Sequence, residues 1–158
     1  MKSLRRSHIV VVGGADSPGG QFLAARLRRM MIKQVTTVAD FDEARRVCRA
    51  GGVDACLVVL GDAVPDAIAE AQGVAPAHSC GIPTLVIAPV VTPHLRRTAR
   101  RCGYLAALPA RIPPRMLYRR ISAALQGHRS GPGPRRASGH MPPAGSSKSA
   151  AFSKPTVH

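Results

Sequence analysis

The sequence predicts an α/β fold in which five parallel strands form one doubly wound sheet. Short runs rich in β-branched residues alternate with longer segments whose apolar residues recur at helical spacing. The run at residues 55–60 is apolar throughout, as expected for a strand buried on both faces of a parallel sheet. The core is aliphatic, because 45% of the 158 residues are hydrophobic and only 3% are aromatic. These observations predict one folded domain over residues 7–126.

The first half of the chain predicts three strands separated by helices. A strand over His8–Val12 ends at Gly13-Gly14, and apolar residues at helical spacing over residues 22–31 then predict a helix with arginines on its other side. After a strand at residues 34–38, Asp40 is placed to cap a second helix, with Glu43 as the matching capping-box residue and Gly51-Gly52 as its end. The third strand covers residues 55–60.

The second half predicts two further strands and three helices. A weak helical pattern covers residues 67–72, and strands are expected at residues 82–88 and 104–108. Between these strands, residues 93–101 form a helix with Pro93 in its first turn. The last helix opens at Pro113-Pro114, carries an apolar stripe that includes Met116, and closes at Gly127.

Both ends of the chain are expected to lie outside the folded domain. Residues 1–6 read as a flexible N-terminus. Residues 127–158 are rich in Gly, Pro and Ser with scattered basic residues, so they cannot bury enough apolar area to offset their ordering entropy. The sequence predicts a disordered basic C-terminal tail.

Charge is distributed unevenly along the chain, whose formal net charge is +15. All eight acidic residues lie in the first 70 positions beside ten Lys and Arg, so that part carries only +2. The remaining residues hold thirteen Lys and Arg and no Asp or Glu. Such a surface attracts polyanions or an acidic protein face. The alternative is a basic surface with no partner.

Four widely spaced cysteines at positions 48, 56, 80 and 102 form no C-x-x-C pair, so they are expected to be reduced thiols in the core. The apolar run after the basic N-terminus is shorter than a signal-peptide core, and no stretch is long enough to span a bilayer. We therefore expect a cytoplasmic protein that does not bind membranes.

The order and spacing of the predicted elements over residues 7–126 resemble the receiver domain of two-component response regulators. The segments that carry the likeness are residues 9–12, 39–44, 54–60, 82–88 and the pair Leu108-Pro109. The resemblance implies a flavodoxin-like sheet and a role in two-component signal transduction and phosphorelay.

In that family, acids after the first strand hold Mg²⁺, an aspartate ending the third strand accepts a phosphoryl group, a Ser or Thr ends the fourth and a Lys ends the fifth. A carboxylate nucleophile needs these cations to neutralise charge on the transferring phosphoryl oxygens. The corresponding positions here are Gly13, Gly14, Val59, Ala88 and Leu108. All five lack the required group. The resemblance thus implies a degenerate pseudo-receiver, with no metal, no cofactor and no catalysis.

The sequence offers three other kinds of candidate site. Asp16 and Asp62, both expected in loops at the carboxyl edge of the sheet, could form a displaced acidic pair or be solvated capping residues. The glycine-rich residues 13–20 follow a strand and open a helix, as a dinucleotide-binding loop requires, but their spacing fits no such motif. His78 and Cys80 could ligate a metal, although no second pair stands at zinc-site spacing.

The remaining candidate is the surface that receivers use to meet partners, made by the fourth helix, the fifth strand and the fifth helix. Arginines on the two helices recur at spacings of three or four residues and form a candidate docking surface. They are Arg96, Arg97, Arg100, Arg101, Arg115, Arg119 and Arg120. A solvated helix face is the alternative.

Three kinds of partner fit this surface. We expect an acidic protein, such as a histidine kinase or another regulator, and the same face could join two copies of the chain as a homodimer. Weak, sequence-indifferent nucleic-acid binding is the alternative, since the tail adds Arg135, Arg136, Lys148 and Lys154. Against it, Phe152 is the only aromatic residue in the tail that could stack on bases.

Overall fold

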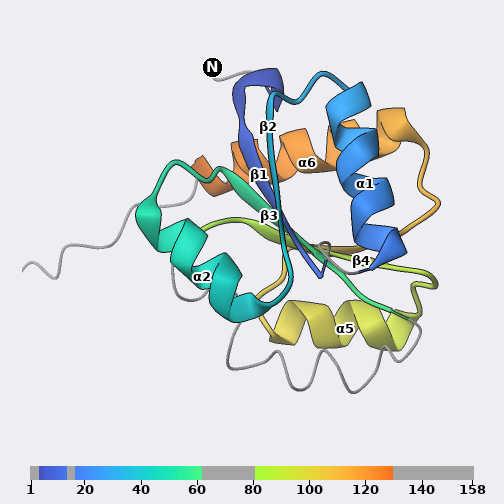
Figure 1. Cartoon of the computed structure of the whole chain (residues 1–158). Coiled ribbons are helices and arrows are strands. Elements are labelled where there is room, and N and C mark those ends of the chain that lie inside the picture. Colours follow the sequence, from blue (N-terminus) through green and yellow to red (C-terminus); the bar gives the residue numbers. More distant parts are fainter. Residues whose placement is uncertain (1–3, 14–16, 62–80, 130–158) are drawn as a thin grey trace, which may run out of the picture.

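A computed structural model describes residues 4–13, 17–61 and 81–129. Five strands alternate with helices in these residues, as the sequence predicts (Figure 1). In chain order they are η1 (Leu4–Arg6), β1 (His8–Val12), α1 (Pro18–Arg29), β2 (Gln34–Val38), α2 (Phe41–Ala50), β3 (Ala55–Val59), β4 (Thr84–Ala88), α5 (Pro93–Arg101), β5 (Ala106–Pro109) and α6 (Pro114–Arg129).

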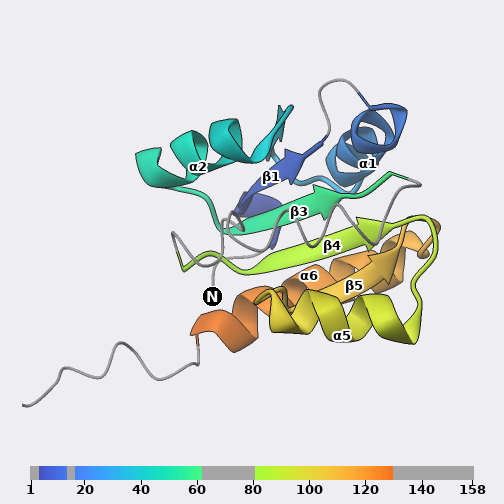
Figure 2. The same cartoon turned by 90° about the horizontal axis from the view of Figure 1, so that it is seen from below.

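All five strands are parallel and lie in the order β2-β1-β3-β4-β5 (Figure 2). The strand β3 is central, and four of its five residues are buried. The predicted strand with apolar residues on both faces is therefore confirmed. In the described part of the chain β5 pairs with β4 alone and forms one edge of the sheet.

Helices cover both faces of the sheet, so the predicted doubly wound arrangement is confirmed (Figures 1 and 2). Successive residues of β1 face opposite sides: Ile9 belongs to the cluster beneath α1 and α6, whereas Val10 belongs to the cluster beneath α2 and α5. From the helices, Leu27 and Leu117 enter the first cluster and Leu95 enters the second. The edge strand β5 consequently lies between two helices, α5 and α6, that stand on opposite faces.

Polar side chains begin three of the helices. The Ser17 hydroxyl accepts a hydrogen bond from the Gly20 N–H (3.1 Å) and the Thr92 hydroxyl accepts one from the Leu95 N–H (3.1 Å). The Asp40 carboxylate accepts from the Glu43 N–H at 2.8 Å, which confirms the predicted cap of α2. Gly51 ends α2 with a left-handed φ of 88°.

Several predicted boundaries are wrong by a few residues. The helix α1 begins at Pro18 because Ser17 caps it, and β3 ends at Val59 rather than at residue 60. The strand β4 begins at Thr84, two residues later than predicted. The strand β5 begins at Ala106 rather than at residue 104, because the Tyr104 N–H still bonds to a carbonyl of α5.

The predicted ends of the domain also need correction. The helix α6 runs through Gly127 to Arg129, since Gly127 does not adopt the left-handed conformation that would stop it. Residues Leu4–Arg6, expected to be flexible, form the 3₁₀ helix η1, and Leu4 is buried against the core.

Cys48, Cys56 and Cys102 are buried and form no disulfide within the described residues, as predicted. Within the described ranges, no helix combines the length and the apolar character needed to cross a membrane. Several predictions fall on residues outside the description: Gly14, Asp16, Asp62, the helix at 67–72, His78, Cys80 and the C-terminal tail.

Candidate functional site

The structure brings four of the predicted pocket positions to one edge of the sheet. Gly13 follows β1, Val59 ends β3, Ala88 ends β4, and Leu108 lies in β5 just before its last residue. Because the strands are parallel, their carboxyl ends meet at a common edge, which is where open α/β sheets bind ligands.

Gly13 and Val59 are in close contact across this edge. Gly13 has a left-handed φ of 78°, and a β-carbon built on it would lie 2.9 Å from the carbonyl oxygen of Val59. The Gly13 N–H is also held, since it donates to the Val38 carbonyl at 3.1 Å. No side chain can occupy position 13 unless this backbone moves.

The other three positions present only aliphatic groups. Val59 is partly buried and packs against the core beneath α1, with its Cγ1 3.5 Å from the β-carbon position of Gly19. Ala88 is completely buried, and Leu108 is 6% exposed. None of these side chains can accept a phosphoryl group, coordinate a cation or neutralise an anion.

Metal and dinucleotide sites also find little support in the described residues. Among residues 4–13, 17–61 and 81–129, no group of three or more His, Cys, Asp or Glu side chains is placed to hold a metal ion. At the start of α1, the Gly20 N–H donates to both the hydroxyl and the carbonyl oxygen of Ser17. This donor is therefore already used by the helix cap and is not directed to a pyrophosphate.

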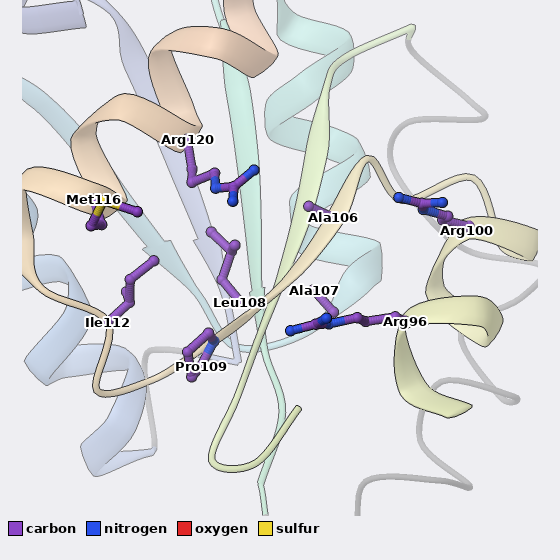
Figure 3. Close-up of a pocket in the computed structure, with 9 residues that line it drawn as sticks. All are labelled: Arg96, Arg100, Ala106, Ala107, Leu108, Pro109, Ile112, Met116 and Arg120. Carbon is purple, nitrogen blue, oxygen red and sulfur yellow. The ribbon is translucent and has the colours of Figure 1, made fainter. Parts of the chain in front are cut away.

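The second candidate region lies along the outer edge of β5. A hollow of about 290 Å³ opens there between α5 and α6 (Figure 3). All four residues of β5 line it. Basic side chains reach it from both helices: Arg96 and Arg120 point toward the strand from opposite sides, and Arg100 lies beside Arg96 (Figure 3).

The predicted arginine cluster is thus divided by the fold. Only Arg96, Arg100 and Arg120 line the β5 hollow. Arg115 and Arg119 line a different hollow of about 390 Å³, together with Arg5, Met30, Pro114 and Tyr118. Arg97 and Arg101 are exposed on α5 and line neither of these two hollows. The arginines expected to form one docking surface therefore do not line one common hollow.

Apolar residues on the α6 side of the β5 hollow were missed by the sequence analysis. Met116 was assigned to the buried stripe of the last helix, but it is 39% exposed and lines the hollow with Ile112. The reason is rotation: Met116 is displaced by about 100° around the helix axis from the buried Leu117. One turn along the helix, Arg120 lies on the same side as Met116.

Arg26 is a second residue whose place was not predicted. It was expected on the solvent side of α1, but its guanidinium donates to the carbonyl oxygens of Ala110 and Ile112 in the segment between β5 and α6. Arg26 therefore ties α1 to the segment that carries part of the hollow's lining. The only sequence signal was its helical position next to an apolar residue.

The sheet order, the parallel strands and the helices on both faces are those of the flavodoxin-like fold. Solved receiver domains share this fold. The chemotaxis protein CheY4 of Vibrio cholerae superposes with a TM-score of 0.60 at 17% identity, covering 75% of this chain and 98% of CheY4. A two-component response regulator from Clostridium difficile gives 0.61 at 16% identity, covering 77% and 97%.

A third similar structure is a complex. The receiver domain of the Saccharomyces cerevisiae response regulator Ssk1, crystallised with the histidine phosphotransfer protein Ypd1, gives a TM-score of 0.59 at 15% identity and covers 77% of this chain and 90% of that one. No protein-family profile and no curated protein sequence matches the chain. At these identities the likeness establishes the fold.

Proposed function

We propose that this chain is a receiver-fold signalling protein that works without phosphoryl transfer, by docking an acidic protein partner on the α5–β5–α6 face. The observation that carries the proposal is the hollow beside β5, where Arg96, Arg100 and Arg120 converge on an apolar floor. No Asp or Glu follows Glu70 in the sequence, so the half of the chain that builds this face supplies no carboxylate side chain to these arginines.

The carboxyl edge of the sheet supports the absence of phosphoryl transfer. Phosphoryl transfer to a receiver needs a carboxylate nucleophile and cations around the transferring group. None of these groups is present at Gly13, Val59, Ala88 or Leu108. Position 13 accepts only glycine, because a β-carbon there would clash with the Val59 carbonyl oxygen. Without phosphoryl transfer, the protein would signal through the surface that binds its partner. We infer that it is not an enzyme.

The chemistry of the hollow favours a carboxylate-bearing protein. A guanidinium presents several N–H donors in a planar fork and forms paired hydrogen bonds with a carboxylate. Apolar residues between the arginines, such as Met116 and Ile112, add contact area that excludes water. The yeast complex, in which a receiver of this fold binds a phosphotransfer protein, supports a kinase or phosphotransfer protein as the class of partner.

A capture experiment with charge-reversal variants tests the proposal. The full chain is immobilised, partners from its native host are identified, and the affinity of each purified partner is measured for Arg96→Glu, Arg120→Glu and, as a matched control, Arg46→Glu on α2. We expect the first two variants to weaken binding at least tenfold and the control to leave it unchanged. Equal binding by all three variants would place the docking surface elsewhere.

Nucleic acid is the second candidate, favoured by the net charge of +15. Retention on DNA and RNA is measured across a salt series, with and without residues 128–158. We expect weak retention that disappears at physiological salt. Tight, salt-sensitive binding would favour the nucleic-acid function instead.

A dinucleotide site at the glycine-rich loop has its own test. Thermal stabilisation of the protein by NAD(P) would support such a site.

A further inference from the structure

We propose that the β5 hollow binds a small organic phosphate, that is, a phosphate monoester carried by an apolar or aromatic body, and that this ligand regulates docking by competing with the protein partner. The ligand site stands on the hollow alone, whereas its regulatory effect rests on the proposed function. Three features carry the inference: arginines gathered without a counter-charge, an apolar floor of small-molecule size, and a wall held by hydrogen bonds.

The arginines of the β5 hollow bring like charges together. Arg96 and Arg100 are four residues apart on α5, a spacing at which two like charges destabilise a helix. Arg120 points toward β5 from the opposite side (Figure 3). None of the residues that line the hollow is acidic, and no ion pair within the described ranges involves these three arginines. An anion bound among the three guanidinium groups would relieve their repulsion.

A phosphate monoester matches this charge better than a single carboxylate does. The phosphate of a phosphorylated side chain carries about −1.5 to −2 charges at pH 7 and offers three acceptor oxygens. A guanidinium group forms paired hydrogen bonds with two such oxygens. Because Arg96 and Arg120 approach from opposite sides of β5, each can bond a different pair of oxygens of the same phosphate.

The floor and one wall of the hollow are apolar. Ala107 and Leu108 form buried parts of the floor, and Ile112 and Met116 stand on the α6 side. These side chains favour a ligand whose phosphate is attached to an alkyl or aromatic body, since that body would cover them and exclude water. The hollow measures about 290 Å³, so it has room for one small molecule.

Hydrogen bonds fix the segment that forms the wall. The Ile112 N–H donates to the Pro109 carbonyl at 3.0 Å, and the Ala110 N–H donates to the Ala88 carbonyl at 2.8 Å. The guanidinium of Arg26 donates to the carbonyl oxygens of Ala110 and Ile112. A wall that is already ordered loses little conformational entropy when a ligand binds. Arg26 is therefore a positioning residue for this site.

Other ligands would use only part of the hollow. Inorganic phosphate would contact the arginines and leave the apolar floor uncovered. An uncharged apolar molecule would cover the floor and leave the guanidinium groups without an acceptor. A nucleic acid would bind through the net positive charge of the whole surface and would depend little on any one arginine. The small organic phosphate satisfies both parts of the hollow.

Competition follows from the overlap of the two sites. Arg96 and Arg120 are the groups that the proposed function assigns to carboxylates of the partner. A phosphate bound to them would prevent those contacts, so ligand and partner would bind in a mutually exclusive way. Any ligand that binds only the partner-free form lowers the apparent affinity for the partner as its concentration rises.

Binding is tested by calorimetric titration of the full-length protein with two probes, phenyl phosphate and adenosine monophosphate. Their separate parts, inorganic phosphate, phenol and adenosine, are titrated for comparison. We expect at least one of the two organic phosphates to bind about tenfold or more tightly than either of its parts. Methyl resonances of Leu108, Ile112 and Met116 should shift in NMR spectra when that probe binds.

Variants separate a defined site from general attraction to a basic protein. Arg96→Gln and Arg120→Gln should weaken binding of the organic phosphate about tenfold or more, whereas Arg46→Gln on α2 removes the same charge and should change it less than about twofold. Met116→Ala should weaken the organic phosphate and leave inorganic phosphate unaffected. Circular dichroism and urea unfolding check that each variant is folded.

Three results would overturn the ligand site. They are the failure of both organic phosphates to bind, equal binding of inorganic phosphate, which would show an adventitious ion only, and an equal loss in Arg46→Gln and Arg96→Gln. The regulatory effect is measured separately, as displacement of the captured partner by the probe that binds. A bound probe that leaves partner affinity unchanged would overturn that effect.

The ligand site and the proposed function can fail separately. If the probe binds in an Arg96-dependent way and charge reversal at Arg96 and Arg120 leaves partner binding intact, the ligand site stands and the proposed docking surface is wrong. If charge reversal abolishes partner binding and neither organic phosphate binds, docking stands and the ligand site is wrong.

Discussion

A β-carbon at position 13 would lie 2.9 Å from the carbonyl oxygen of Val59, a distance that real β-carbons essentially never show. Gly13 and Val59 occupy two of the positions at which the receiver resemblance would require acids. The backbone at position 13 is suited to glycine alone, because β1 ends in a turn with a left-handed φ at Gly13. An acidic side chain introduced at position 13 would conflict with this backbone.

We predict that Gly13→Asp destabilises the protein by about 2 kcal/mol or more, because it combines a left-handed φ with a backbone clash. Urea unfolding followed by circular dichroism measures the change. Gly61→Asp is the matched control, since nothing lies within 4 Å of its β-carbon position, and it should change the free energy of unfolding by less than about 0.5 kcal/mol. Equal effects of the two substitutions would contradict the steric argument.

We predict that the protein is not phosphorylated by a small phosphodonor in the presence of Mg²⁺, and that Val59→Asp does not become a phospho-acceptor. A carboxylate at position 59 would still lack a cation ligand at position 13 and a lysine at position 108. Intact-mass spectrometry measures this. A phosphoryl mass gain on the unmodified protein that Asp62→Asn abolishes would show a displaced acidic site and overturn the pseudo-receiver interpretation.

Tyr104 provides a prediction about pH. Its ring is buried, its hydroxyl has no hydrogen-bond partner within the described structure, and burial, with smaller effects of Cys102 and Cys56, raises its pKa from 10.0 to about 12. The folded state thus keeps a proton that the unfolded state loses, so this contribution to stability is complete below pH 10 and is lost as the pH rises toward 12. The loss amounts to about 3 kcal/mol.

The variant Tyr104→Phe should remove that part of the pH dependence. At neutral pH it should leave the free energy of unfolding unchanged or raise it by about 1 kcal/mol, because an unsatisfied buried hydroxyl is removed. Urea unfolding at pH 7, 10 and 11.5 makes the comparison, with Tyr118→Phe on α6 as the control. A large loss of stability at pH 7 in Tyr104→Phe would reveal a hydrogen-bond partner for the hydroxyl.

We predict that Asp40→Ala lowers the free energy of unfolding by about 1 kcal/mol, because the Glu43 N–H loses its acceptor at the start of α2. Asp42→Ala is the control in the same turn. It removes only an exposed ion pair with Arg45, worth less than about 1 kcal/mol. If the two variants lose equal stability, the cap does not contribute as proposed.

Much of the fold could be predicted because its signals are local. A strand with an apolar residue at every position is expected to be buried on both faces of the sheet. The central place of β3 could therefore be predicted from its own composition. Asp40 and Pro93 also predicted helix starts from local signals, since one is a capping residue and the other a proline in the first turn. The four pocket positions could be located as well, since the end of each parallel strand reaches the same edge of the sheet.

The docking surface could be predicted only in part. Sequence spacing grouped seven arginines, but it could not show that Arg115 and Arg119 turn toward a different hollow from Arg120. That division depends on how α6 is rotated about its axis when Leu117 and Ile121 enter the core. Rotation is set by packing against the whole sheet rather than by neighbours in the chain.

The chain's own residues therefore specify the alternating strands and helices, the basic second half and the loss of every acidic, hydroxyl and lysine group at the predicted phosphorylation pocket. The packed structure decides which arginines line the same hollow, that the Val59 carbonyl excludes a side chain at position 13, and that β5 lines a hollow between α5 and α6. The physical reason is the sequence separation over which each kind of interaction acts. Propensity, caps and periodicity act within a few residues, whereas these contacts join segments brought together only when the sheet and its two helical layers pack.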